Sequence, residues 1–429
     1  MPRVLFALLF ASSCAACGPQ IPKTLGELPL DKVALGGTPI LAYLQDALAD
    51  GRERSVAQLF VEEKIEFGDA PDPSPLFARR FDAARAAAPP RVAQPLKVLS
   101  YNVGLLDRAK ILGFIDRVAV PEIEARRAVI ADAILGRGYD VLLLQEVWEL
   151  RDVDAFREAA VRHGYRCHGG SDANHPAHGL LMLVKESIID ADAGEEQYEI
   201  FYEVQYDLES FPGPGMRRAY LTWRLTTSEG IPLRLFDTHL TAFEEHWRVR
   251  MAQARELGLA VAASPDSDVI VLGGDLNAAP YYADSTWRRP DGSEFSEWWH
   301  NAISYPLLLF YGDLQDALVS ARPAQDVELG RLVPYQPDTE IPYGSPGYCE
   351  RTPPVVFTAT DCNSLSLRSY GGQAPPERID YVMYRATDRP LYVAGAELVF
   401  TERRAFPGAG TFELSDHYGV LAELHVETR

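Results

Sequence analysis

The chain is short of positive charge and of cysteine. It has 41 Lys and Arg residues against 61 Asp and Glu residues, which gives a formal net charge of −20 in 429 residues. Because nucleic-acid binding relies on clustered basic side chains, this balance predicts no stable nucleic-acid partner. With only five cysteines, the chain is not a small protein held together by disulfide bonds. Its 47% hydrophobic residues suffice to form one large core or two ordinary ones.

The chain also lacks the signatures of several common catalytic sites. It has no G-x-S-x-G elbow, no G-x-x-x-x-G-K-[S/T] loop and no G-x-G-x-x-G run after a strand. No Cys/His spacing indicates structural zinc. Four histidines at 163, 168, 175 and 178 invite a metal hypothesis, but their irregular spacing favours solvated loop positions.

The first seventeen residues have the layout of an export signal. Arg3 is followed by an apolar run at 4–10 and then by small residues. The run is too short to span a bilayer. Residues 11–18, with Cys14 and Cys17, resemble a bacterial lipobox, although the sequence does not choose between the two cysteines or exclude a simple cleaved signal. We expect a cell-envelope lipoprotein, associated with the membrane through an N-terminal lipid, or a secreted protein.

Three domains follow from the pattern of the chain. Residues 1–17 form the signal peptide or lipobox, residues 18–94 an N-terminal extension and linker, and residues 95–429 the catalytic domain. The Pro-rich segments 72–75 and 86–95 mark the linker. In the last domain, outside the cytoplasm, a disulfide between Cys349 and Cys362 would be permitted; free buried thiols are the alternative.

One strand end organises the rest of the sequence. Residues 269–272 are apolar and mostly β-branched, two glycines follow, and then Asp275 and Asn277 emerge two residues apart. The pattern predicts a buried strand whose end presents a carboxylate and an amide. Taken alone, an ordinary turn after a strand explains these residues equally well.

Other short apolar runs end in the same way. Polar groups suited to metal binding or acid–base chemistry stand at or beside the ends of five further predicted strands: Asn102, Glu146, His239, Asp380, and Asp416 with His417. Together, and in this order, these motifs are similar to those of the endonuclease/exonuclease/phosphatase superfamily over residues 96–426. The resemblance implies an α/β fold, a four-layer sandwich of two packed mixed β-sheets with outer helices.

The resemblance assigns roles to five catalytic residues. Asp275 would orient or deprotonate the attacking water, and Asn277 would donate to a phosphate oxygen. His239 would contact the phosphate or protonate the leaving group. Asp380 would hold the ring of His417, and whether Asp275 or His417 is the general base stays open.

The resemblance also implies a hard divalent cation, Mg²⁺ or alternatively Mn²⁺. Glu146 is the leading ligand, with Asn102 and Asp416 near the metal or the phosphate. Carboxylate and amide oxygens suit such a cation, whereas a dedicated zinc centre would show Cys and His ligands.

Within the superfamily, residues 238–242 together with 250–257 resemble the neutral sphingomyelinase branch. Residues 375–380 lack the Pro-Ala-Trp-Cys-Asp-Arg run of inositol-polyphosphate 5-phosphatases, and Val184 stands where the family commonly has Ser. We therefore expect a Mg²⁺-dependent phosphodiesterase acting on a phospholipid headgroup. The alternatives are an extracytoplasmic nuclease or phosphatase on the same fold, and an inactive binding module. The oligomeric state stays unknown.

Periodicity places the remaining elements. Helices are expected at 122–135, 154–162 and 245–261, a strand at 179–185, and a hairpin from 216–225 and 233–237. Residues 305–310 fit a helix and turn better than a membrane-inserting loop. Residues 321–377 are rich in Pro and polar residues, which indicates a long surface excursion over the active site.

Overall fold

The computed structural model describes most of the chain after residue 92. The described residues are 93–106, 109–111, 115–117, 120–170, 178–205, 217–242, 246–279, 304–321, 327–328, 331–332, 357–370, 377–386 and 388–428. The predicted signal segment 1–17 and Cys349 lie outside them. Among the described helices, none is both long and apolar enough to cross a membrane.

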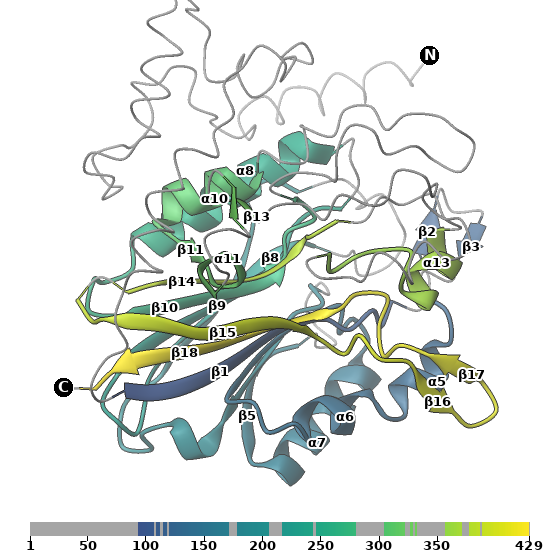
Figure 1. Ribbon diagram of the computed structural model, residues 1–429, viewed down its shortest axis with the longest axis horizontal. Helices are drawn as coiled ribbons and strands as arrows, with labels where there is room; N and C mark the ends of the chain where they lie inside the picture. Colours follow the sequence, from purple (N-terminus) through teal and green to yellow (C-terminus); the bar gives the residue numbers. More distant parts are fainter. Residues whose placement is uncertain are drawn as a thin grey trace, which may run out of the picture.

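Two six-stranded β-sheets form the centre of the molecule (Figure 1). In each sheet one neighbouring pair runs parallel and the other pairs run antiparallel. The first sheet has the order β15 (Leu391–Val399), β18 (Gly419–Glu427), β1 (Ala93–Asn102), β4 (Val141–Gln145), β6 (Leu181–Lys185), β5 (Tyr165–Gly169). The second has the order β11 (Gln315–Asp316), β14 (Asp380–Arg385), β10 (Val269–Asp275), β9 (Pro232–His239), β8 (Ala219–Thr226), β7 (Glu196–Phe201).

The central strands are apolar because both of their faces are covered. Every residue of β4 and of β10 is buried. One apolar cluster, which includes Val98, Leu143, Leu235 and Val271, fills the space between the two sheets. A second cluster lies between the first sheet and its helices, and a third between the second sheet and its helices.

Helices cover the outer face of each sheet, so that four layers result (Figure 1). On the first sheet lie α5 (Ile123–Arg127), α6 (Ile130–Leu135) and α7 (Leu150–His163); on the second lie α8 (Trp247–Ala262) and α10 (Ser304–Gly312). This arrangement confirms the predicted four-layer sandwich. Shorter elements are the 3₁₀ turn η2 (Glu186–Ile188), α11 (Ala317–Ala321), α13 (Ser364–Tyr370), and the strand pairs β2 (Ala109–Ile111) with β3 (Ile115–Arg117), β12 (Val327–Glu328) with β13 (Arg331–Leu332), and β16 (Arg404–Phe406) with β17 (Gly410–Phe412).

Gly273 allows the two sheets to approach closely beside the end of β10. A Cβ atom there would lie 2.6 Å from the Leu143 side chain and 3.1 Å from Cβ of Ser100, both in the other sheet. The glycine is therefore required by packing between the sheets, and not only by the turn that its position before Asp275 suggests. The close approach brings the ends of β1, β4 and β10 together.

Several local predictions need correction. The single helix expected at 122–135 is wrong: Val129 leaves the helical conformation with φ −130° and separates α5 from α6. The helix expected to start at 154 begins at Leu150. His178 is buried, with Nε2 3.2 Å from Oε1 of Glu199, so it is not a solvated loop residue. The hairpin of β8 and β9 is confirmed, and so is a helix at 305–310, whose Leu308 and Leu309 are buried.

Candidate active site

The site forms where central strands of both sheets end side by side. In the second sheet, Asp275 at the end of β10 pairs with His239 on β9 and with Asp380 on β14. In the first sheet, Asn102 at the end of β1 pairs with Gln145 at the end of β4. The strand order thus gathers residues that are distant in sequence at one edge of the sandwich.

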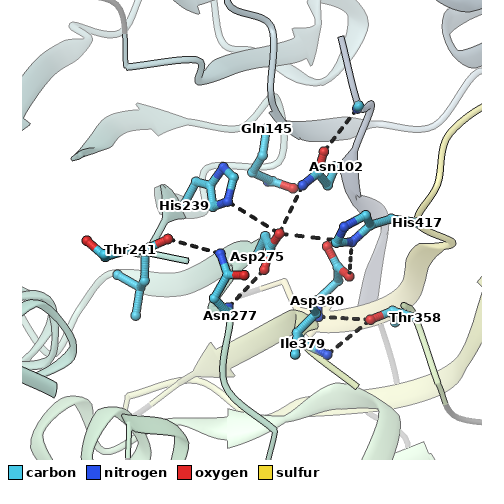
Figure 2. A network of polar contacts seen from close by, with 12 residues as sticks. Asn102, Gln145, His239, Thr241, Asp275, Asn277, Thr358, Ile379, Asp380 and His417 are labelled. Atoms are coloured by element: carbon cyan, nitrogen blue, oxygen red, sulfur yellow. Dashed lines mark hydrogen bonds and ion pairs between the residues drawn. The ribbon is translucent and has the colours of Figure 1, made fainter. Parts of the chain in front are cut away.

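The carboxylate of Asp275 lies at the centre of this group (Figure 2). Its Oδ2 accepts a hydrogen bond of 2.9 Å from the side-chain amide of Asn102, and its Oδ1 accepts one of 2.8 Å from the backbone N–H of Asn277. The Asn277 amide in turn donates to the Leu240 carbonyl at 3.0 Å. Asn277 has φ +47°, a left-handed conformation that asparagine tolerates better than most residues. Three hydrogen bonds therefore fix both oxygens of Asp275 and the side chain of Asn277.

Burial makes Asp275 a weaker acid than usual. It raises the pKa of Asp275 to about 6, and the neighbouring Asp380 carboxylate acts in the same direction. The positive charge of His417 and the hydrogen bonds from Asn102 and Asn277 oppose this rise. A carboxyl group with such a pKa is ionised near neutral pH but remains basic enough to accept a proton.

Two histidines flank Asp275 on opposite sides (Figure 2). Nε2 of His239 lies 3.4 Å and Nδ1 of His417 lies 3.9 Å from Oδ2 of Asp275. Burial lowers the pKa of His239 well below its usual value, and the charges of Arg218 and His417 lower it further. His239 is therefore neutral at neutral pH. Its Nδ1 is buried without a hydrogen-bond partner among the described residues.

His417, unlike the neutral His239, is protonated at neutral pH. Its Nδ1 lies 2.8 Å from Oδ2 of Asp380, so Nδ1 carries the hydrogen and Nε2 is left for other contacts. Burial alone would lower the pKa of His417, but the Asp380 carboxylate, through its charge and this hydrogen bond, raises it well above the usual value, helped by Asp275 and Asp416. The predicted pairing of Asp380 with His417 is thus present.

Thr358 connects the start of β14, which carries Asp380, to the residues just before β18, which include His417. Its hydroxyl accepts hydrogen bonds of 3.1 Å from the backbone N–H groups of Ile379 and Asp380, and its carbonyl accepts one of 2.8 Å from Tyr418. Sequence reasoning missed this residue. It lies in the segment 321–377, which was predicted to cover the active site. The part of the segment that contains Thr358 instead binds the backbone next to Asp380 and His417.

The predicted metal ligands Glu146 and Asp416 bring further negative charge to the site. Burial raises the pKa of Glu146 to about 7, with Asp416 as the next cause and Asp275 also contributing. Glu146 has φ +63°, an uncommon conformation for glutamate that places it directly beyond the end of β4. The Asp416 carboxylate lies against Gly104, where a Cβ atom would be only 2.5 Å from Oδ1.

Arg126 binds the backbone of the loops next to Asn102 and Asp416. It is fully buried, and its Nη1 donates to the carbonyls of Val103 and Leu414 at 3.0 and 3.1 Å. Its Nη2 donates to the Gly104 carbonyl at 2.5 Å. We did not predict this role from the sequence. A signal was present, because Arg126 is three residues after Ile123 and four before Ile130, on the apolar face of the predicted helix.

The donor set fits a hard divalent cation. Glu146 and Asp416 offer carboxylate oxygens. Burial first, and then the neighbouring negative charge of Asp416, raise the pKa of Glu146, and a bound cation would offset both effects. Asp275, Asp380 and His417 also place ligand atoms within 4.8 Å of one another. In that second group, however, Nδ1 of His417 and Oδ2 of Asp380 already bind each other. We therefore favour Glu146 and Asp416 as ligands, with Asn102 beside them.

The hydrogen bonds of Asn102 limit what it can contribute as a metal ligand. Its Oδ1 accepts a hydrogen bond of 3.0 Å from the Gly104 N–H, and its amide donates to Asp275. One lone pair of Oδ1 remains for a ligand. The structure thus gathers six predicted residues in one cluster of hydrogen bonds and ion-pair contacts: Asn102, His239, Asp275, Asn277, Asp380 and His417. The predicted acidic ligands Glu146 and Asp416 interact electrostatically with this cluster. The catalytic and ligand roles of these residues stay predictions.

Cys362 is disulfide-bonded, and its partner lies outside the described residues. Cys167 is a free thiol, and burial raises its pKa to about 11. The higher pKa makes this thiol unreactive at neutral pH. Neither cysteine adds to the candidate site.

A family model described as Endonuclease/Exonuclease/phosphatase family matches residues 99–417. A search among curated proteins found no match.

Solved structures with a similar fold have low sequence identity. TDP2 from D. rerio, complexed with a single-strand DNA product, is 17% identical, with 77% of this chain and 99% of that chain covered and a TM-score of 0.49. Sphingomyelinase C from Streptomyces griseocarneus is 19% identical, with 77% and 99% covered and a TM-score of 0.47. The human Nocturnin catalytic domain with a bound sulfate anion is 17% identical, with 79% and 100% covered and a TM-score of 0.47. None of these likenesses decides the substrate.

Proposed function

Since this chain belongs to the Endonuclease/Exonuclease/phosphatase family, a family of metal-dependent phosphoesterases, we propose that it is a Mg²⁺-dependent phosphodiesterase that hydrolyses a phospholipid headgroup. The main support is the fixed carboxylate of Asp275, which lies between His239 and His417 with Asn277 at its side. Hydrolysis of a phosphodiester needs a base for water, donors for the phosphoryl oxygens and a group that favours departure of the leaving oxygen.

Asp275 is the proposed general base. The raised pKa of His417 keeps that imidazole protonated near neutral pH, whereas Asp275, with a pKa of about 6, is ionised there. The hydrogen bonds from Asn102 and Asn277 hold the carboxylate in one orientation. Asp275 is thus the group better suited to take a proton from water.

Asn277 and His239 are the proposed phosphate contacts. A neutral His239 cannot act as an imidazolium acid, but it can donate one hydrogen bond to a phosphoryl oxygen. The lowered pKa of His239 therefore favours contact with the phosphate over protonation of the leaving group. Protonated His417, held by Asp380, adds a positive charge to the same region.

Glu146 and Asp416, with Asn102 close by, are the proposed ligands of Mg²⁺ or Mn²⁺. When bound, such a cation neutralises charge on the phosphoryl oxygens and on the leaving oxygen. Arg126 keeps the backbone on both sides of this group in place through the carbonyls of Val103, Gly104 and Leu414.

The proposed lipid substrate rests on three features of the sequence. Residues 238–242 with 250–257 resemble the neutral sphingomyelinase branch, and the strongly acidic balance disfavours nucleic acid. The leader with Cys14 and Cys17 supports export and attachment to a membrane. An enzyme attached in this way meets lipid substrate at high effective concentration.

Release of phosphocholine from sphingomyelin vesicles by the full chain tests the proposal. We expect release with Mg²⁺, restoration by Mn²⁺ after EDTA, and loss of release in the Asp275→Asn variant. If folded, Mg²⁺-loaded protein releases nothing from sphingomyelin or phosphatidylcholine, the lipid assignment is wrong. Cleavage of single-stranded DNA or of p-nitrophenyl phosphate under the same conditions would then favour a nuclease or a phosphatase, and failure on all of them an inactive binding module.

A further inference from the structure

Arg218, the residue before β8, has a buried guanidinium nitrogen beside the catalytic group, and this nitrogen has no hydrogen-bond partner among the described residues. Its Nη1 is buried and has no hydrogen-bond partner, and no carboxylate forms an ion pair with it among the described residues. Its guanidinium lies over the ring of Trp148, with Cζ 5.6 Å from the ring centroid. A ring face attracts a cation but offers no acceptor in the plane of the guanidinium.

The position of Arg218 is fixed by its backbone. Its N–H donates to Oε1 of Gln205, and its carbonyl accepts from Nε2 of the same side chain, both at 2.8 Å. The Gln205 amide also donates to the Tyr202 carbonyl at 2.8 Å. The backbone of Arg218 is therefore fixed at the start of β8, and no hydrogen bond to Nη1 from a described residue is needed to hold the side chain there.

The guanidinium lies on the His239 side of the site. The ring of Trp148 lies 6.3 Å from the ring of His239, and Trp148 is two residues after Glu146. The charge of Arg218 lowers the pKa of His239 and opposes the rise in the pKa of Glu146. These effects place Arg218 within electrostatic range of both residues, although it forms no ion pair with Glu146.

Burying an ionised group without a partner is among the most costly arrangements in a protein. Burial lowers the pKa of Arg218, but a guanidinium stays protonated at neutral pH in spite of this. The distant charges of Glu146 and Asp275 offset part of the cost. The unused donor at Nη1 still requires an acceptor, and none of the residues that the structure describes supplies one.

We propose that Arg218 is a substrate contact whose Nη1 donates a hydrogen bond to a phosphoryl oxygen, on the side of the site that carries His239. This inference rests on the proposed phosphodiesterase function, because the anion it assigns is the phosphate of the substrate. Arg218, His239 and Asn277 then supply donors from three different strand ends. A guanidinium suits this role because its planar array of N–H groups matches phosphate geometry.

Arg217 provides a matched control. It carries the same charge one residue away, but its guanidinium lies over the ring of Phe201, with Cζ 4.8 Å from the centroid. Arg217→Gln and Arg218→Gln therefore remove the same charge from adjacent positions. Only the second removes the unpartnered donor beside His239.

The experiment compares the full-length, Mg²⁺-loaded wild-type protein with Arg217→Gln, Arg218→Gln and Arg218→Lys. Affinity for inorganic phosphate is measured by calorimetry, kcat/KM with sphingomyelin vesicles, and Tm without phosphate. We expect Arg218→Gln to weaken phosphate binding and kcat/KM by about 10- to 100-fold, as for loss of one charged hydrogen bond. Arg218→Lys should fall between wild type and Arg218→Gln, and Arg217→Gln should stay within about 3-fold of wild type.

The Tm separates a substrate contact from a structural role. Nη1 of Arg218 makes no hydrogen bond among the described residues, so Arg218→Gln should lose only the contact with the ring of Trp148, as Arg217→Gln loses the contact with Phe201. The Tm of Arg218→Gln without phosphate should therefore equal or exceed that of Arg217→Gln. A Tm well below that of Arg217→Gln, or failure of Arg218→Gln to fold, would show that Arg218 supports the fold and would overturn the inference. Phosphate affinity equal to that of Arg217→Gln would overturn it as well. If wild-type protein cleaves no phosphodiester but binds phosphate in an Arg218-dependent manner, the proposed function fails while the anion site stands.

Discussion

The side-chain amide of Asn102, at the end of β1, donates a 2.9 Å hydrogen bond to the carboxylate of Asp275, at the end of β10. The two residues are 173 positions apart in the sequence and belong to different sheets. The orientation of the proposed base therefore depends on how the sheets pack, and Gly273 permits that packing next to Asp275. A change in the core between the sheets should for this reason affect catalysis as well as stability.

Replacing Asp275 with Asn should lower kcat by about 10²- to 10⁴-fold, because an amide cannot accept the proton of water. The side chain keeps its shape, so circular dichroism and Tm should show a folded protein. Asp192→Asn is the control, since Asp192 is exposed and lies in the turn before β7, the edge strand of the second sheet. Equal turnover by Asp275→Asn and Asp192→Asn would remove Asp275 from the mechanism.

Removing the metal should reverse the usual rise of stability with pH. In the metal-free folded protein the pKa of Glu146 is raised from 4.5 to about 7, and that of Asp275 from 3.8 to about 6. The folded state then binds more protons than the unfolded state, so the free energy of unfolding falls as the pH rises from about 4 to about 7. Saturating Mg²⁺, which binds ionised carboxylates, should reduce this fall.

Urea unfolding in EDTA across this pH range measures the effect. Burial also raises the pKa of Asp237 well above its usual value, which adds to the same trend. The Glu146→Gln variant isolates the part due to Glu146, since glutamine does not titrate, and its profile should be flatter than that of wild type. Superimposable profiles would show that Glu146 is not held in a protonated state.

Gly104→Ala should weaken Mg²⁺ binding. Gly104 has φ +57°, and a Cβ atom there would lie 2.5 Å from Oδ1 of Asp416 and 2.9 Å from the Ser415 hydroxyl. Gly164→Ala is the matched control because Gly164 has φ +71° with nothing within 4 Å of the added Cβ. Both variants carry a similar backbone cost of about 1 kcal/mol, but only the first displaces Asp416. In a calorimetric Mg²⁺ titration, only Gly104→Ala should show a higher Kd than wild type. The same Kd for Gly104→Ala and Gly164→Ala would argue against Asp416 as a ligand.

Arg126→Met should destabilise the protein by at least about 3 kcal/mol, because three buried carbonyls would lose their donor at about 1–3 kcal/mol each. Those carbonyls belong to Val103, Gly104 and Leu414. Arg162→Met, which removes only an exposed ion pair to Asp132, should cost less than about 1 kcal/mol. Denaturant unfolding compares the two, and similar losses would show that the carbonyl contacts of Arg126 contribute little.

The sequence predicted the family and the fold, and both are confirmed. It was less accurate where local periodicity competes with packing. The expected helix 122–135 ignored the break at Val129, and the buried contact of His178 with Glu199 could not be found from histidine spacing. The acylated cysteine, the envelope location and the extension 18–94 stay predictions.

The sequence by itself determined which residues stand at the strand ends. Alternation, apolar runs and the residues that end them are local properties, so Asn102, Glu146, His239, Asp275 and Asp380 could be placed without coordinates. Only the tertiary structure decided which of these groups touch and what charge they carry. Three features depend on segments far apart in the chain, because distance and desolvation are set by packing. They are the hydrogen bond between Asn102 and Asp275, the protonated state of His417, and the Nη1 of Arg218, which has no hydrogen-bond partner among the described residues.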